Sequence, residues 1–167
     1  MFAQVKAGVR MPTKIKSVLF VCLGNICRSP TADGVFRAKA DAAGLQLKID
    51  SCGTAGWHLG KSPDPRAVAE AAKNGYDLSM LRARQVTQQD FSEFDLILAM
   101  DQSNLNNLDA IAPCGHSAQV QKFTDILPNE HPMKGADVPD PYYEDNFDDV
   151  IALIEDGLDA LIAQLGA

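Results

Sequence analysis

The chain has 167 residues and a mass of 18.0 kDa, a size that fits one domain with its own hydrophobic core. Hydrophobic residues make up 46% and charged residues 22%, which is typical of folded globular proteins and excludes a disordered or fibrous chain. The net charge of −7 and the pI near 4.8 argue against broad nucleic-acid binding, which requires a basic surface. No apolar run reaches the roughly 20 residues that span a bilayer, and Met1 to Arg10 lack the features of a secretion signal, so we expect a cytoplasmic protein with no membrane partner.

Cysteine and histidine usage argues against disulfides and metal sites. The chain contains four cysteines, Cys22, Cys27, Cys52 and Cys114. Their number and spacing indicate neither a disulfide scaffold nor a structural zinc site, so we expect free thiols in a reducing compartment. The histidines are isolated from one another and are expected at surface or loop positions: His58, His116 and His131. The sequence predicts no metal and no cofactor.

The hydrophobic pattern predicts alternating strands and helices after a first segment without periodicity. Residues 1–15 are therefore expected to form a flexible N-terminal extension, and residues 16–167 a single domain. Strands are expected at residues 17–22, 47–50, 95–100 and 119–123. Helices are expected at residues 30–43, 65–74, 102–112 and 147–165. Residues 124–146 are rich in proline and have no periodic pattern, which is typical of a functional or disordered loop.

This alternation predicts an α/β fold with a parallel sheet covered by helices on both faces. Ligands of such sheets bind beyond the carboxyl ends of the strands, near the point where the winding reverses. Cys22 ends the first predicted strand, Asp101 follows the third, and Asp140 lies in the long segment after the fourth. We therefore expect these three side chains to converge on one rim of the sheet.

The segment VCLGNICRSP has the features of an anion site. Cys22 and Arg28, separated by five residues, follow an apolar run and precede the helix-starting pair Ser29-Pro30. A strand that ends in a short loop before a helix directs several backbone N–H groups at one point, where a phosphate fits. The same groups favour the thiolate form of a cysteine, which is its nucleophilic form. The planar guanidinium of Arg28 can hold two phosphate oxygens at once.

Taken singly, Cys22 and Arg28 have simpler interpretations, as a buried cysteine and an ordinary arginine in a first helical turn. The other loop residues favour the anion site because each has a separate part in it. Gly24 allows the backbone to approach a ligand closely, and Asn25 tolerates a left-handed conformation. Ser29 can donate a proton toward the thiolate, and Pro30 suits the first helical position.

The sequence Cys22-Leu23-Gly24-Asn25-Ile26-Cys27-Arg28-Ser29-Pro30 resembles the phosphate-binding loop of the low-molecular-weight protein tyrosine phosphatases. The resemblance runs from about Lys16 to the C-terminus and leaves out only the first fifteen or so residues. Further matches follow in the order of the family, among them Asp50-Ser51, Trp57, Ser62-Pro63-Asp64-Pro65-Arg66, Ala83-Arg84-Gln85, Met100-Asp101 and Asp140-Pro141-Tyr142-Tyr143. The resemblance implies a flavodoxin-like fold with a four-stranded parallel sheet.

The resemblance also implies a role for each matching residue. Cys22 is the expected nucleophile. Asp140 is the expected general acid and later the base. Without the resemblance, the Asp-Pro pair would be interpreted equally well as part of a turn. Arg28 is expected to hold the phosphoryl group together with the rest of the loop, Leu23, Gly24, Asn25, Ile26, Cys27 and Ser29. Aromatic walls are expected from Trp57, Tyr142 and Tyr143, which without the resemblance we would place in the core.

Three residues are expected to support the loop. Ser51 and Asn25 resemble bracing hydrogen-bond partners, and Asp101 is expected to cap the following helix and to orient Arg28. Cys27 has two interpretations that its spacing leaves equally open. It is either a small buried residue or a second thiol that forms a reversible disulfide with Cys22, and the resemblance favours the redox role.

The predicted function is a metal-independent protein tyrosine phosphatase that hydrolyses phosphotyrosine and aryl phosphates through a phosphocysteine intermediate. We expect phosphate or other oxyanions in the loop, tyrosine-phosphorylated proteins and a tyrosine kinase as partners, and a monomer or weak dimer. Relatives that act on phosphoarginine have Thr where this chain has Ile26, which favours phosphotyrosine here.

Three other classes remain as alternatives. An arsenate reductase shares the predicted fold but needs a relay pair of cysteines that the chain lacks. A flavodoxin-like binding module would leave the combination of Cys22, Arg28 and Asp140 without a purpose. Receptor-type tyrosine phosphatases place the acid before the cysteine, whereas here the cysteine comes first.

Overall fold

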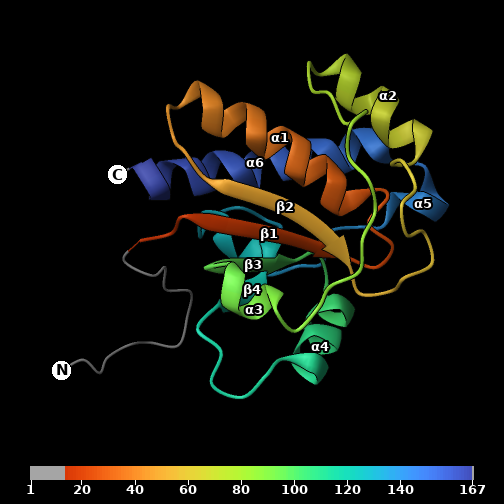
Figure 1. Cartoon of the computed structure of the whole chain (residues 1–167). Helices are drawn as coiled ribbons and strands as arrows, with labels where there is room; N and C mark the ends of the chain where they lie inside the picture. Colours follow the sequence, from red (N-terminus) through yellow and green to blue (C-terminus); the bar gives the residue numbers. More distant parts are fainter. Residues whose placement is uncertain (1–13, 167) are drawn as a thin grey trace.

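The computed structural model describes residues 14–166, which form a parallel four-stranded sheet with helices on both faces (Figure 1). The strand order is β2-β1-β3-β4. The strands are β1 (Ser17–Cys22), β2 (Lys48–Gly53), β3 (Leu96–Ala99) and β4 (Gln119–Lys122). The helices are α1 (Arg28–Ala42), α2 (Pro65–Lys73), α3 (Asp90–Glu93), α4 (Gln102–Ile111), α5 (Pro141–Glu144), α6 (Phe147–Gly166) and the 3₁₀ turn η1 (Phe123–Ile126). The predicted α/β class is confirmed, and most of the predicted extension, residues 1–13, lies outside the described residues.

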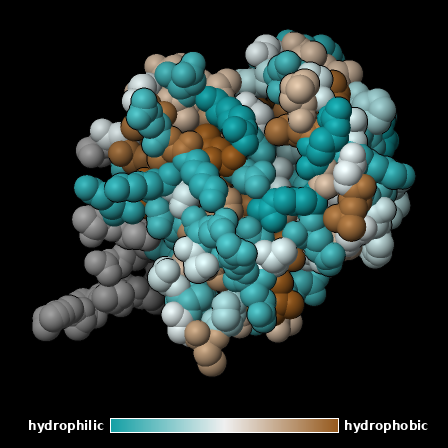
Figure 2. Space-filling model, viewed as in Figure 1, coloured by the Kyte–Doolittle hydropathy of each residue, from teal (hydrophilic) through white to brown (hydrophobic). Residues whose placement is uncertain are grey.

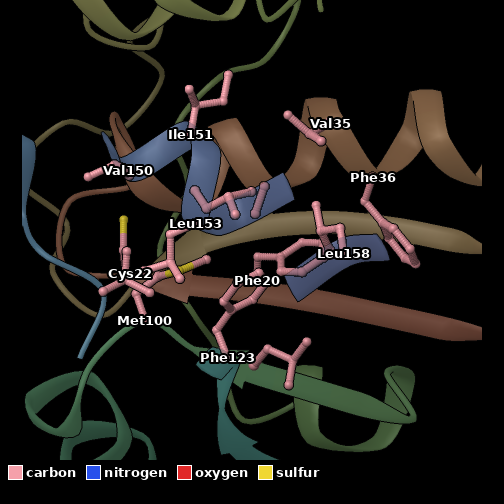
Figure 3. Close-up of a cluster of buried hydrophobic side chains, with 14 of the residues drawn as sticks. Phe20, Cys22, Val35, Phe36, Met100, Phe123, Val150, Ile151, Leu153 and Leu158 are labelled. Atoms are coloured by element: carbon pink, nitrogen blue, oxygen red, sulfur yellow. The ribbon is translucent and has the colours of Figure 1, made fainter. Parts of the chain in front are cut away.

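The two faces of the sheet form two separate hydrophobic cores. Helices α1, α2 and α6 cover one face, and α3 and α4 cover the other (Figure 1). Phe20 points into the first core, where its ring meets that of Phe36 edge-on with centroids 5.7 Å apart (Figure 3). Its neighbours Leu19 and Val21 point into the second core because side chains alternate along a strand. All six residues of β1 are therefore buried, which explains why β1 is a continuous apolar run.

The outer surface is mainly hydrophilic. Seen from the side of Figure 1, its hydrophobic side chains lie in separate patches (Figure 2). None of the helices within residues 14–166 has the length and hydropathy needed to cross a membrane.

Strand β1 is the point where the winding of the sheet reverses. The chain passes from β1 through α1 to β2 on one side, and β3 then pairs with the other side of β1. At such a reversal the connections after the two adjacent strands diverge and leave a crevice beyond their carboxyl ends. The loop after Cys22 and the start of α4 after Met100 both border this crevice. The fold thus brings the residues expected in the site to one edge of the sheet.

Two predicted boundaries next to the site were wrong. Helix α1 begins at Arg28, so Pro30 is its third residue and not its first. Proline is still tolerated there, because the first four N–H groups of a helix have no partner within the helix. Strand β2 continues three residues beyond Asp50, because Ser51 and Gly53 pair in register with Phe20 and Cys22. Ser51 therefore lies within a strand next to the phosphate loop.

The short elements were missed. Helices α3 and α5 each have four residues. Phe123, predicted as the last residue of the fourth strand, is the first residue of η1. A single turn is too short to show helical periodicity, so these elements leave little trace in the sequence. The segment predicted to be a structureless loop therefore contains η1 at its beginning and α5 near its end.

Candidate active site

The loop between β1 and α1 wraps around the sulfur of Cys22. The backbone N–H of Asn25 points at Sγ with an N···S distance of 3.3 Å, and the hydroxyl of Ser29 lies 3.0 Å from the same sulfur. Asn25 has a φ of 57°, the left-handed conformation that turns its N–H inward. Since α1 begins at Arg28, the loop ends at the N-terminus of a helix, which together with the donors around Sγ favours a negative charge here.

Buried hydrogen bonds brace the loop from behind. The amide nitrogen of Asn25 donates to the hydroxyls of Ser29, at 2.8 Å, and Ser51, at 3.0 Å. The amide oxygen of Asn25 accepts from the backbone N–H of Arg84 at 3.0 Å. Asn25 and Ser29 were expected to bind substrate, but neither lines the cavity described below, and both are buried. They shape the loop, and the structure places Ser51 in the bracing position expected for it.

Arg28 is almost fully buried and is held by several acceptors. Its Nη1 donates to Asp101 Oδ2 at 2.7 Å and to the carbonyl oxygen of Val138 at 2.9 Å. Its Nη2 lies 3.6 Å from Asp140 Oδ2. Burial opposes the charge of the guanidinium, but Cys22 and Asp101 outweigh it and raise the pKa of Arg28. A fixed positive charge therefore stands beside the loop.

Asp101 has two tasks at the end of β3. Its Oδ1 accepts the N–H of Asn104 at 2.8 Å, and the Asn104 side chain accepts the N–H of Asp101, which together form the capping box of α4. Its other oxygen holds Arg28. The expected helix cap and the expected contact with Arg28 are thus made by the two oxygens of one carboxylate.

Asp140 is the N-cap of α5. Its Oδ1 accepts the backbone N–H of Tyr142 at 3.1 Å, and Pro141 occupies the first helical position. The segment before it is tied to the sheet because the N–H of Val138 donates to the carbonyl oxygen of Met100 at 2.8 Å. The carboxylate is thereby brought from a distant part of the sequence to the wall above Cys22.

A cavity of about 240 Å³ opens at this point. Its lining residues are Cys22, Leu23, Gly24, Ile26, Cys27, Arg28, Trp57, His58, Asp140, Tyr142 and Tyr143. Trp57 and Tyr143 are 70% and 84% exposed, so these aromatic residues stand at the mouth of the cavity and not in the core. No group of three or more metal-binding side chains gathers anywhere in residues 14–166.

Comparison with known proteins assigns the chain to a family. The model of the low molecular weight phosphotyrosine protein phosphatase family matches residues 17–167. The chain belongs to this family. As a member it is an enzyme of the hydrolase class, the class of the protein-tyrosine-phosphatases.

Named relatives of this phosphatase come from distant organisms. The low molecular weight protein-tyrosine-phosphatase YfkJ of Bacillus subtilis is 41% identical over 151 residues, covering 89% of this chain and 95% of the relative. The low molecular weight phosphotyrosine protein phosphatase of Schizosaccharomyces pombe is 47% identical over 142 residues, covering 82% and 88%.

Solved structures show the same fold. The crystal structure of YfkJ has a TM-score of 0.84 at 40% identity and covers 91% of this chain and 95% of its own. The Drosophila arginine phosphatase DARP has a TM-score of 0.81 at 27% identity, covering 88% and 96%. The fold is therefore shared by relatives whose names state different substrates.

His58 is a residue of the phosphatase cavity that the sequence did not identify. It was expected at a surface or loop position, and it does lie in a loop, but its ring packs against the backbone of Gly24, where an added Cβ would be 3.0 Å from the ring. The available signal was its position next to Trp57, because neighbours in a loop at the rim share the same surroundings.

Cys27 lines the phosphatase cavity as a second thiol. Burial, with Asp64 and Cys22 adding to it, raises the pKa of Cys27 far above its ordinary value. Cys27 therefore stays protonated at neutral pH and does not compete with Cys22 as a nucleophile. All four cysteines lie within the described residues and are free thiols.

Proposed function

We propose that this phosphatase hydrolyses phosphotyrosine in proteins through a phosphocysteine formed at Cys22. The observation that carries the proposal is the meeting of three groups from separate segments at one cavity: the sulfur of Cys22, the guanidinium of Arg28 and the carboxylate of Asp140. A nucleophile, a fixed cation and an acid are the groups that cleavage of an aryl phosphate without a metal requires.

In the first step the thiolate of Cys22 attacks phosphorus and forms an S–P bond. The bond between phosphorus and the phenolic oxygen breaks, its electron pair stays on oxygen, and Asp140 delivers a proton there. The transferring group carries its charge on three equatorial oxygens, which the loop N–H groups and Arg28 bind. These donors are already fixed by Asn25 and Asp101, so they need not reorganise during the reaction.

In the second step Asp140, now a carboxylate, takes a proton from a water molecule that attacks the phosphocysteine. The S–P bond breaks, and inorganic phosphate and the thiolate are released. The hydroxyl of Ser29, 3.0 Å from Sγ, stabilises the sulfur as it leaves. The cycle consumes one water molecule and returns Cys22 and Asp140 to their starting states.

The mouth of the cavity favours an aromatic substrate. Trp57 and Tyr142 offer ring surfaces on which a phenyl ring can stack, and Ile26 adds an apolar contact beside the loop. The likeness to the Drosophila arginine phosphatase makes phosphoarginine the competing substrate. Aromatic rings can also stack on a guanidinium, but the aliphatic side chain of Ile26 favours a phenyl ring over a guanidinium, so we favour phosphotyrosine. The partners in this function are tyrosine-phosphorylated proteins of the cytoplasm and the kinase that phosphorylates them.

The redox role proposed for Cys27 uses the same site. Cys27 is buried in the loop that holds Cys22, so it is the thiol with which an oxidised Cys22 would form a disulfide. Such a disulfide protects the nucleophile from irreversible oxidation.

A substrate panel tests the proposed function. We expect the protein to hydrolyse phosphotyrosyl peptides faster than phosphoarginyl and phosphoseryl peptides, with no loss of activity in a chelator. Cys22→Ser should abolish turnover, whereas the matched variant Cys114→Ser, at an exposed cysteine, should keep it. Asp140→Ala should lower kcat by about 10² to 10⁴ on phenyl phosphate and by less on substrates with good leaving groups. Turnover by Cys22→Ser, or its loss in a chelator, would contradict the proposal.

A further inference from the structure

The two walls of the cavity belong to separate segments, and Arg66 joins them. Trp57 and His58 lie in the loop that leads to α2, and Asp140 and Tyr142 lie at α5. Arg66 is the second residue of α2 and touches both segments, although its side chain does not line the cavity. None of the steps described above uses it.

On the side of the loop, Arg66 is tied to the phosphate loop through Asp64. Its Nε and Nη2 donate to the two oxygens of Asp64 at 3.1 and 2.9 Å, the bidentate geometry of a strong arginine–carboxylate pair. The hydrogen bond from Arg66 lowers the pKa of Asp64, so the pair stays charged. The backbone N–H of Asp64 donates to the carbonyl oxygen of Ile26 at 2.8 Å.

On the other side, Arg66 holds α5. Its Nη2 donates to the carbonyl oxygen of Tyr142 at 3.2 Å, and its Nη1 lies 3.6 Å from Asp145 Oδ1. The guanidinium also packs over the rings of Tyr142 and Phe147, 5.5 and 4.8 Å from their centroids. A helix of four residues has no stability of its own, so contacts of this kind decide how α5 lies.

We infer that Arg66 is a positioning residue for the general acid. By tying α5 to Asp64 and the phosphate loop, it sets where the carboxylate of Asp140 stands relative to Cys22, because Asp140 caps that same helix. The inference rests on the proposed role of Asp140. A misplacement of about 1 Å can cost on the order of 100-fold in rate, so a contact outside the cavity is sufficient to matter.

The effect should appear in catalysis more than in stability. The side chain of Arg66 is 43% exposed, and ion pairs of such exposure contribute little to folding. Removing Arg66 is therefore expected to leave the thermal midpoint close to that of the parent, while the distance between the acid and the leaving group becomes less well defined.

The test compares aryl phosphates with leaving groups of different pKa. We expect Arg66→Ala to lower kcat about 10-fold on phenyl phosphate, and by less on p-nitrophenyl phosphate, which needs little help from an acid. Arg66→Lys should recover part of the loss. A lysine can pair with Asp64, but it cannot bridge Asp64 and α5 or stack on the ring of Tyr142 as a guanidinium does. Arg82→Ala is the matched control, because the hydrogen bonds of this exposed arginine within residues 14–166 go to carbonyls of its own loop, and it should behave like the parent.

A double-mutant cycle and hydrogen exchange separate this inference from the proposed function. In the Asp140→Ala background, Arg66→Ala should cause almost no further loss, because the group that it positions is gone. In the otherwise unchanged protein, Arg66→Ala should speed amide exchange at residues 140–147 and leave residues 22–29 as protected as before.

Two results would overturn the inference while the proposed function stands: additive losses in the cycle, or unchanged exchange at residues 140–147. If Asp140→Ala itself shows no dependence on the leaving group, the proposed function fails, and the inference that Arg66 positions the acid fails with it. The exchange result then still decides whether Arg66 holds α5.

Discussion

Asn25 occupies the left-handed backbone region in the middle of the phosphate loop, and its side chain is buried. The amide is one of the few side chains that tolerate this conformation and can also donate and accept in opposite directions. It does both here, since it donates to Ser29 and Ser51 and accepts from Arg84. The shape of the loop around Cys22 thus depends on one side chain that does not line the cavity.

At the residue scale, Asn25→Ala is expected to lower both kcat and the rate at which iodoacetate alkylates Cys22. The change leaves the partly buried N–H of Arg84 without its acceptor, at a cost of about 1 to 3 kcal/mol, which corresponds to a roughly 5- to 150-fold effect. Peptide mapping of the alkylated protein measures the reaction at Cys22 separately from the exposed Cys114. Asn107→Ala, on the exposed surface of α4, is the control. Alkylation of Cys22 at the parent rate would show that the loop holds its shape without Asn25.

At the scale of elements, α6 approaches the end of the sheet closely at Gly157. A Cβ added there would lie 2.5 Å from two ring carbons of Phe123, the first residue of η1. The ring is fully buried and packs against Phe20 of β1, so it has no free space into which to move. Glycine in the middle of this helix is therefore required by packing, although it lowers helix propensity.

Gly157→Ala is expected to destabilise the protein by up to about 2 kcal/mol. The gain in helix propensity of about 1 kcal/mol is smaller than the cost of overpacking, about 1 to 3 kcal/mol or more in a rigid site such as this one. Gly166→Ala, in the last turn of the same helix with open space around it, should be neutral or slightly stabilising. Urea unfolding of the two variants measures the difference. Equal midpoints would mean that Phe123 shifts at little cost.

At the scale of the whole molecule, Tyr76 links the chain after α2 to α6. Its hydroxyl donates to Glu155 Oε2 at 2.6 Å. Burial and then the hydrogen bond to Glu155 raise the pKa of Tyr76 from its ordinary 10.0 to about 12. The folded state therefore holds this proton more tightly than the unfolded state, and the contribution to stability is complete below pH 10 and is lost as the pH rises through 12.

Tyr76→Phe should lower the free energy of unfolding by about 1 kcal/mol at pH 7, a value reduced by the partial exposure of the pair. The difference in unfolding free energy between the variant and the parent should shrink as the pH is raised from 10 toward 12. In this range the parent loses the stabilisation from the protonated Tyr76 hydroxyl, which the variant lacks at every pH. Urea unfolding across this pH range checks both statements. Tyr143→Phe, at an exposed hydroxyl, serves as the control, and a difference that is constant with pH would contradict the assignment.

The sequence by itself determined the parts of this protein that depend on near neighbours in the chain. Strands buried on both faces appear as apolar runs, long helices appear as a period of 3.6 residues, and the phosphate loop is one uninterrupted strand–loop–helix segment from Cys22 to Ser29. The α/β class and the residues of the loop were therefore predictable, although the start of α1 and the end of β2 were misplaced.

Only the tertiary structure decided which distant residues meet and how the one-turn elements lie. The strand order brings Asp101 and Val138 to Arg28, and the N–H of Arg84 to Asn25, across separations that no local pattern encodes. Helix α5 has too few residues to form alone, so its place and that of Asp140 follow from contacts with the rest of the molecule. The physical reason is that local patterns report burial and turn preference, whereas an active site is assembled from segments that become neighbours only when the core has packed.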